Sequence, residues 1–343
     1  MASQECGKVT LSQQANMKLN QFFNGISAGA LSVLLCSCSG SKEGVSARSE
    51  ESAGAVTQAA AAPAAIIASN IGSPQRLTDG DYDNGLGSVN QDGNQVVFQT
   101  NRDGKWQIYL LNLADNTQTH LVVSDANDEN PVWMPDGNSV LFVSDRNGGG
   151  SEWERDIYLY DTVSGETRRM TESAGDDWYP VSSASDSYLY LSEKGDPSSP
   201  VMDRPNALYR GYMDGRAPEL VIPPEADPSS PIVLDSDRVV FRNREGRLGV
   251  YTISVGTSEP LTSPDLRCGN PSYSSPNGWL AFNGSAGDGF QLYLFDLASK
   301  TSQKLETGSS EVRYPQFTPD GGAIIYSAKA GDHFQLFKIE IAR

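Results

Sequence analysis

The chain has 343 residues, with 43 acidic and 26 basic side chains and a formal net charge of −17. Such an excess of negative charge argues against nucleic acid as a partner and against electrostatic docking on anionic lipid. The two histidines of the chain also disfavour a histidine-rich metal site or a Ser-His-Asp triad.

The N-terminal residues are typical of a bacterial lipoprotein signal peptide, expected over 1–37. A basic residue, Lys18, precedes an apolar run over 22–35 that is too short to cross a membrane as a helix. Residues 1–16 contain no apolar run, so Met17 is an alternative start. The sequence LCSC at 35–38 resembles a lipobox, in which Cys38 takes the lipid because a small residue, Ser37, precedes it.

A lipidated cysteine followed by a disordered linker is expected over 38–73. This segment is rich in Ser, Gly, Glu and Ala and has no aromatic residue, a composition that cannot form a packed core. Its reach is roughly 30 Å. Ser39 follows the lipidated cysteine, and the absence of Asp there fits sorting to the outer membrane. We therefore expect a monomer on the periplasmic side of the outer membrane, held there only by its lipid anchor.

A pattern repeated six times follows and predicts an all-β chain. The clearest copy, NPVWMPDGNSVLFVSDR over 130–146, is followed by DIYLYD over 156–161. Each copy contains a tight turn, often Pro-Asp-Gly, between two short strands. Copies recur roughly every 40–50 residues, which predicts a six-bladed β-propeller of four-stranded blades over 74–343. The repeat anchors are Ser88, Pro131, Pro180, Pro231, Pro271 and Pro315.

The last copy stops after its third strand, and one spare strand, PQRLT over 74–78, precedes the first copy. We expect 74–78 to complete the last blade, since ring closure protects the sheet edges that an open array would expose. The alternative is that 74–78 is only the end of the linker.

The loops leading into the first strands are acidic and should converge on one mouth of the channel. They form the candidate binding rim, where concentrated charge favours a cationic partner or Ca²⁺. Trp178 is expected to add an aromatic contact, and Arg267 and Arg313 to act as internal counter-charges. The alternative is ordinary turn chemistry. The rim residues are Asp81, Asp83, Asp125, Asp128, Asp176, Asp177, Trp178, Asp227, Arg267 and Arg313.

One of these loops is a candidate calcium site. Asp79, Asp81 and Asp83 have the spacing of a calcium loop, but Gly85 comes one place late and Asn90 stands where an EF-hand has Glu. Ca²⁺ is therefore expected only as an irregular site.

The motifs NPVWMPDGNSVLFVSDRNG and RYPQFTPDGGAIIYSAKAGDHFQLF resemble the TolB family of six-bladed propellers. The resemblance covers about residues 74–343. It implies an envelope scaffold, since the TolB propeller docks a peptidoglycan-associated lipoprotein over its channel mouth. TolB proteins also carry an α/β domain before the propeller, and 39–73 is too short and too polar for one. The expectation is a TolB-like lipoprotein without that domain, and the cell-division role of the family is not carried over.

The expected function is thus binding, without catalysis: a periplasm-facing lipoprotein scaffold for a cationic envelope protein or peptide. The alternative is a hydrolase or lyase acting on carbohydrate or lactone substrates through channel carboxylates and a divalent metal.

Overall fold

The computed structural model describes residues 67–148, 154–173, 175–193, 204–287 and 289–342. All of them belong to one compact unit, residues 63–343. The expected signal peptide over 1–37, the expected lipid attachment site Cys38 and most of the expected linker lie outside the described residues. In the described part of the chain, no helix has the length and apolar character needed to cross a membrane.

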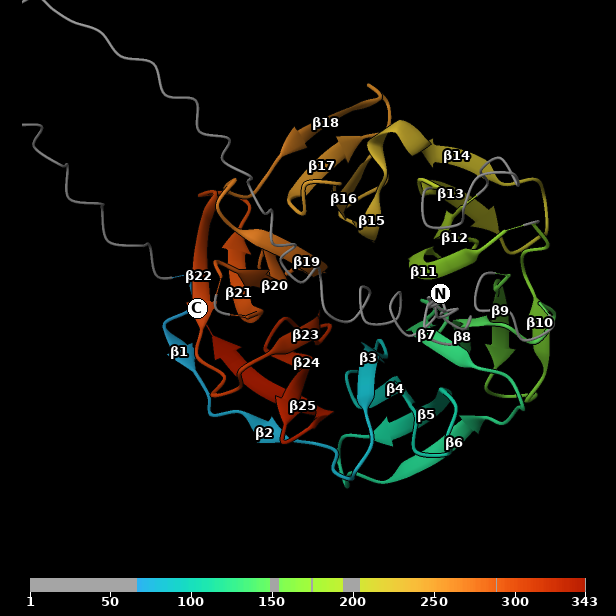
Figure 1. The fold of residues 1–343 in the computed structure, drawn as a ribbon, viewed down its shortest axis with the longest axis horizontal. Helices are drawn as coiled ribbons and strands as arrows, with labels where there is room; N and C mark the ends of the chain where they lie inside the picture. The colour runs from blue at the N-terminus through green and yellow to red at the C-terminus, as the bar shows by residue number, and fades with distance from the viewer. Residues whose placement is uncertain (1–66, 149–153, 174, 194–203, 288, 343) are drawn as a thin grey trace, which may run out of the picture. The chain divides into compact units, whose positions relative to one another are not determined.

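Six antiparallel sheets are arranged in a ring, each with its first strand innermost (Figure 1). We call them blades 1–6 in chain order. Blades 1–3 consist of β3 (Asn84–Val89), β4 (Gln95–Thr100), β5 (Gln107–Asn112) and β6 (Gln118–Val122); β7 (Asp128–Trp133), β8 (Ser139–Ser144), β9 (Asp156–Asp161) and β10 (Thr167–Arg169); and β11 (Asp177–Ala184), β12 (Ser187–Ser192), β13 (Ala207–Tyr212) and β14 (Glu219–Ile222).

Blades 4–6 repeat this order, with a short 3₁₀ helix, η2 (Pro224–Ala226), ahead of blade 4. Their strands are β15 (Ser229–Val233), β16 (Arg238–Arg242), β17 (Leu248–Thr252) and β18 (Thr257–Pro260); β19 (Arg267–Ser274), β20 (Trp279–Ser285), β21 (Gln291–Asp296) and β22 (Thr301–Leu305); and β23 (Val312–Phe317), β24 (Ala323–Ala330) and β25 (His333–Ala342), completed by β1 (Asn70–Ile71) and β2 (Gln75–Arg76). The six-bladed propeller predicted from the repeat is confirmed.

The second strand of each blade carries the core. Every residue of β8 and of β12 is buried, because a blade is covered on both faces by its neighbours. This is why these strands are apolar at successive positions, where a half-exposed strand would alternate.

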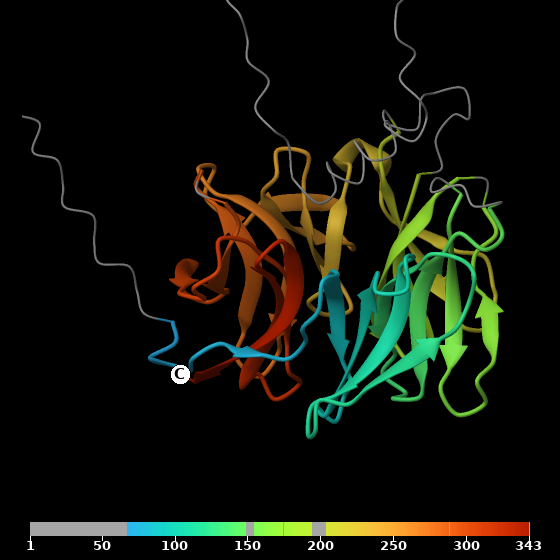
Figure 2. The ribbon, with the colours of Figure 1, turned by 60° about the horizontal axis from the view of Figure 1, so that its bottom comes forward.

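The N-terminal segment closes the ring as predicted. Gln75 and Arg76 of β2 pair with Lys338 and Phe337 of β25, and Figure 2 shows this blue strand beside the red C-terminal one. The expected linker boundary at residue 73 is wrong, because Ile71 already pairs with Ile341. The N–H groups of residues 67 and 68 also donate to the side-chain oxygen of Gln303.

Candidate functional site

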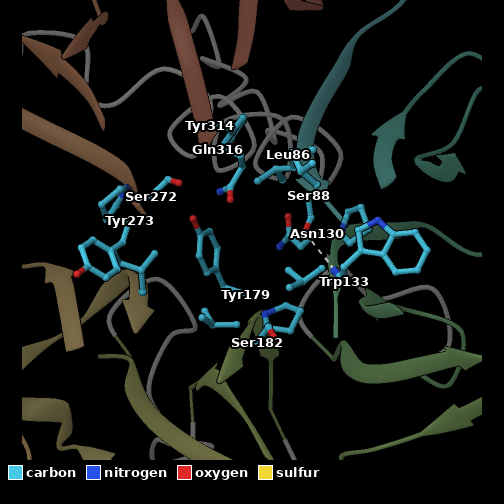
Figure 3. Close-up of a pocket in the computed structure, with 18 of the residues that line it drawn as sticks. Leu86, Ser88, Asn130, Trp133, Tyr179, Ser182, Ser272, Tyr273, Tyr314 and Gln316 are labelled. Carbon is cyan, nitrogen blue, oxygen red and sulfur yellow. Dashed lines mark hydrogen bonds between the residues drawn. The ribbon is translucent and has the colours of Figure 1, made fainter. Parts of the chain in front are cut away.

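A cavity of about 290 Å³ lies on the axis, lined by the first strands of all six blades. Figure 3 shows the polar ends of Asn130, Tyr179 and Gln316 directed toward its centre. The other lining residues are prolines, small or aliphatic residues, serines and aromatic residues. Among the described residues, no side chain that lines the cavity carries a formal charge.

One residue of each first strand has a left-handed backbone conformation. Each lies at a shift in register between the first and second strands, as in a β-bulge. A positive φ is uncommon outside glycine and costs of order 1–3 kcal/mol, so packing of the whole ring has to impose it. The six residues are Leu86 (φ 47°), Asn130 (53°), Tyr179 (51°), Ser230 (46°), Asn270 (43°) and Tyr314 (52°).

We call these six residues the bulge ring. Their positions show that the repeat was aligned one residue too late in blade 1. Proline follows the bulge residue in blades 2 to 6, whereas Gly87 follows it in blade 1. The structural equivalent of Pro131 is therefore Gly87, and the expected anchor Ser88 is one residue too late. The shift was invisible in the sequence because blade 1 lacks the proline.

Hydrogen bonds between neighbouring blades hold the inner strands together. The backbone N–H of Asn130 donates to Gln99 Oε1 of blade 1 at 2.8 Å. Ser88 Oγ accepts the backbone N–H of Trp133 at 3.1 Å, the dashed contact in Figure 3. Phe317 makes the equivalent contact with Ser272 at 3.0 Å between blades 6 and 5. The cavity wall is thus cross-linked between blades 1 and 2 and between blades 5 and 6.

Two tyrosines of the bulge ring, Tyr179 in blade 3 and Tyr314 in blade 6, line the cavity. Burial raises the pKa of both hydroxyl groups. The side chains of Asn270 and Ser230, in the two following blades, partly offset this rise in the pKa of Tyr179. Both hydroxyls therefore remain protonated at physiological pH and can donate hydrogen bonds to a ligand.

Of the predicted rim, Asp128 and Asp177 are each the first residue of an inner strand and are fully buried. Arg146 donates to both carboxylate oxygens of Asp128 at 2.8 and 3.0 Å. Ser192 and Ser173 donate to Asp177 at 2.5 and 2.6 Å. These carboxylates tie the first strand of a blade to the second strand or to the neighbouring loop.

Other acids of the rim join one blade to the next. Asp83 Oδ1 accepts the backbone N–H of Phe334 in the preceding blade at 2.8 Å. Asp176 Oδ1 accepts that of Arg155 at 3.2 Å, and Asp227 Oδ1 that of Asn206 at 3.0 Å. Asn127 makes the equivalent contact in blade 2. Turn residues of the rim therefore have a repeated structural role, the alternative that the sequence left open.

The expected role of Trp178 as an exposed contact is wrong. Its side chain is 5% exposed, packs in the core and donates from Nε1 to Asn206 at 3.1 Å. Tyr179 lies at the bulge of β11 in a left-handed backbone conformation, and its ring contacts that of Trp178 edge-on, with 5.9 Å between the ring centroids. The residue that reaches the cavity is Tyr179, which the sequence left as either contact surface or core.

The counter-charges also differ from those expected. Arg155 Nη2 lies 2.5 Å from Asp176, and Arg146 pairs with Asp128. Arg313 instead pairs with Glu311 and lies over the ring of Phe334 at 4.3 Å. Burial, followed by the positive charge of Arg267, lowers the pKa of Arg242, so Arg267 faces another cation.

Asp81 and Asp125 are the exposed acids of the rim. Within the described ranges, no group of three or more His, Cys, Asp or Glu side chains is placed so that it could hold a metal ion. In the loop considered for calcium, Asp83 is already engaged by Phe334.

Residues 57–207 match the family described as the TolB beta propeller domain. The chain carries a TolB-like β-propeller. This agrees with the six sheets, and with the strand order within them, described above.

One curated relative and two solved structures are similar to this TolB-like propeller. "Uncharacterized protein Atu1656" of Agrobacterium fabrum is 28% identical over 118 residues, which is 34% of this chain and 37% of that protein. TolB from Acinetobacter baumannii has a TM-score of 0.59 at 18% identity, over 70% of this chain and 58% of that one. An oligogalacturonate lyase in complex with manganese has a TM-score of 0.56 at 14% identity, over 79% and 93%. The two solved structures share the fold with this chain.

Proposed function

We propose that this protein is a lipoprotein on the periplasmic side of the bacterial outer membrane, whose propeller binds a protein or peptide partner at its central cavity. The observation that carries the proposal is the cavity itself. Inner strands of six blades converge on it, and they present neutral hydrogen-bonding groups and aromatic surface. A concave site with a few directed polar groups favours specific binding.

Charge supports a basic region in the partner outside the cavity. The chain has a net charge of −17, and Asp81 and Asp125 of the entry loops are exposed. Long-range attraction to this surface would speed the encounter and weaken as salt rises. The membrane anchor is assigned to Cys38, and the LCSC sequence at 35–38 supports it.

The alternative function, a hydrolase or lyase acting on carbohydrate or lactone substrates, has less support. A hydrolase or lyase of the expected kind needs a pair of carboxylates or a set of metal ligands at the cavity. Among the described residues, the lining supplies neither. The likeness to an oligogalacturonate lyase concerns the fold at 14% identity. Binding is therefore the function that the cavity supports best.

The test is affinity capture from envelope extract with the purified full-length chain. Ser182 lines the cavity from β11, so Ser182→Arg should block it with a long charged side chain. Ser299 is exposed in the outer turn between β21 and β22, so Ser299→Arg is the matched control. We expect a stoichiometric partner with the wild type and the control, and its loss with Ser182→Arg, which circular dichroism should show to be folded although the added charge lowers its melting temperature.

Salt and chelator complete the experiment. Rising salt should weaken capture, whereas a chelator should leave it unchanged if no metal takes part. Capture that Ser182→Arg leaves intact would refute the cavity as the binding site. Turnover of a uronate polymer or lactone, lost when Asp81 and Asp125 become Asn, would favour the enzyme instead.

A further inference from the structure

We propose that the central cavity selects a segment of the partner that carries no charged side chain, with Asn130, Tyr179 and Gln316 as the residues that set this preference. The inference rests on the proposed function and goes beyond it, because it states the chemistry of the part that enters. It also separates two regions of the partner: a neutral segment inside the cavity and a basic region outside.

The first argument is the cost of burying a charge. An ion moved from water into a protein cavity has to find an opposite charge and hydrogen bonds, or it is strongly disfavoured. In the part of the chain that the structure describes, the cavity lining offers no charged group. Tyr314, one of the lining residues, is itself buried.

The second argument is that the ions near the cavity already have partners. Arg155 lies 3.8 Å from Glu129 and 2.5 Å from Asp176. Arg313 and Glu311 form an ion pair. A charged side chain entering the cavity would have to compete with an ion pair that is already formed. These ions therefore contribute little to its stabilisation.

The third argument is what the lining does offer. Asn130 and Gln316 each present an amide with two N–H donors and a carbonyl acceptor, and Tyr179 presents a hydroxyl. Their polar ends are directed toward the centre of the cavity (Figure 3). An extended peptide has alternating N–H and C=O groups of the same neutral kind, so it can match both donors and acceptors. Prolines and aromatic residues of the wall supply the apolar contact.

One experiment probes the cavity without any partner. Gln316→Glu adds a carboxyl group of nearly the same shape to the lining, and Gln91→Glu adds one in the exposed turn between β3 and β4. Burial should raise the pKa of the carboxyl group introduced at position 316 above about 4.3, the value in the unfolded chain. The penalty is then absent below that pH and grows as pH rises through the folded-state pKa.

The measurement is the melting temperature of the full-length chain at pH 4 and pH 7. Relative to wild type, Gln316→Glu should lose about 3–5 °C more at pH 7 than at pH 4 for each unit by which the pKa is raised, and Gln91→Glu should show no such difference. Equal behaviour of the two variants would overturn the inference, since the cavity would then solvate a charge freely. If Gln316→Glu fails to fold, Asn130→Asp repeats the test at a second lining position.

A second experiment reads the selection directly, with a phage-displayed library of random heptapeptides as the probe. The wild type should enrich peptides with an uncharged stretch, Ser182→Arg should abolish the enrichment, and Gln316→Glu should shift it toward Lys or Arg at one position. Enrichment that depends on the cavity but carries a constant charged residue would overturn the inference alone. Failure to enrich any peptide in a way that Ser182→Arg abolishes would overturn the proposed function, and the inference with it.

Discussion

Thr78 donates its hydroxyl to the side-chain oxygen of Gln335 at 2.9 Å, although 257 positions separate the two residues. The same hydroxyl accepts the backbone N–H of Leu336 at 2.8 Å. Gln335 is fully buried, and its side-chain oxygen also accepts from Asn84 of blade 1 at 2.8 Å. One buried amide thus joins the closing segment, the last blade and the first blade.

We expect Thr78→Val to lower the free energy of unfolding by about 1–3 kcal/mol, because it leaves the buried N–H of Leu336 without its acceptor at nearly constant side-chain volume. Chemical denaturation monitored by circular dichroism measures the change. Thr257→Val, at an exposed position of the outer strand β18, is the control and should be close to neutral. Equal effects of the two substitutions would mean that this hydrogen bond adds nothing to closure.

Deletion of residues 74–78 should cause a larger loss. It removes β2 and leaves an unpaired edge on β25 beside Phe337 and Lys338, so the melting temperature should fall and association between molecules should increase. Differential scanning calorimetry and light scattering measure the two effects. Deletion of five residues from 55–59, ahead of the described residues, is the control. An unchanged melting temperature would show that closure does not stabilise the ring.

Blade 1 provides a natural reference for the ion pair of blade 2. Asn84 stands where blade 2 has Asp128, and Arg102 donates to its side-chain oxygen at 3.3 Å. We therefore expect Asp128→Asn to lower stability by only about 1 kcal/mol. Asp128→Leu should cost about 3 kcal/mol, because Arg146 then loses its buried partner. Denaturation midpoints of the two variants test this, and equal losses would contradict it.

Tyrosine ionisation should lower stability at alkaline pH. Burial, followed by the hydrogen bond from Tyr109 to Asp103, raises the pKa of Tyr109 to about 12, and burial raises that of Tyr188, Tyr190 and Tyr326. Unfolded tyrosine ionises near pH 10. The stabilisation is present below that pH and is lost as pH rises through the folded-state values. Ultraviolet titration should show delayed tyrosinate formation, and Tyr109→Phe should reduce the pH dependence of unfolding. Ionisation of every tyrosine near pH 10 in the folded protein would contradict the prediction.

The proposed lipid anchor can be tested in the sequence at 35–38. We expect Cys38→Ser to release the protein from the membrane fraction and to leave an unprocessed precursor, because the thiol proposed to take the lipid is gone. Cys36→Ser should remain processed and membrane-bound. Fractionation followed by immunoblotting and mass spectrometry distinguishes them. Normal processing of the Cys38→Ser variant would remove the lipoprotein assignment.

Local chemistry is sufficient to predict the fold from sequence. Pro-Asp-Gly turns such as 135–137 and apolar runs such as 140–143 specify hairpins whose strands are covered on both faces, and their sixfold recurrence specifies the ring. Even closure by 74–78 followed from counting strands, because an open edge is unfavourable. The same local signals recur in six copies. A copy that departs from the pattern, such as blade 1 with Gly87 in place of proline, therefore did not obscure the period.

The site, in contrast, was decided by tertiary structure. The acids of the entry loops look alike in the sequence. In the structure, Asp128 and Asp177 are buried and accept hydrogen bonds. Asp81 and Asp125 are exposed to solvent. The difference arises because Arg146 and Ser192 lie next to the two buried carboxylates in the folded blades. Tyr179 and Trp178 are adjacent, and the bulge in β11 determines that the tyrosine lines the cavity. Sequence by itself determined which strands form, because that depends on neighbours in the chain. Which side chains remain available to a ligand depends on partners from other strands and blades, which only the closed ring brings together.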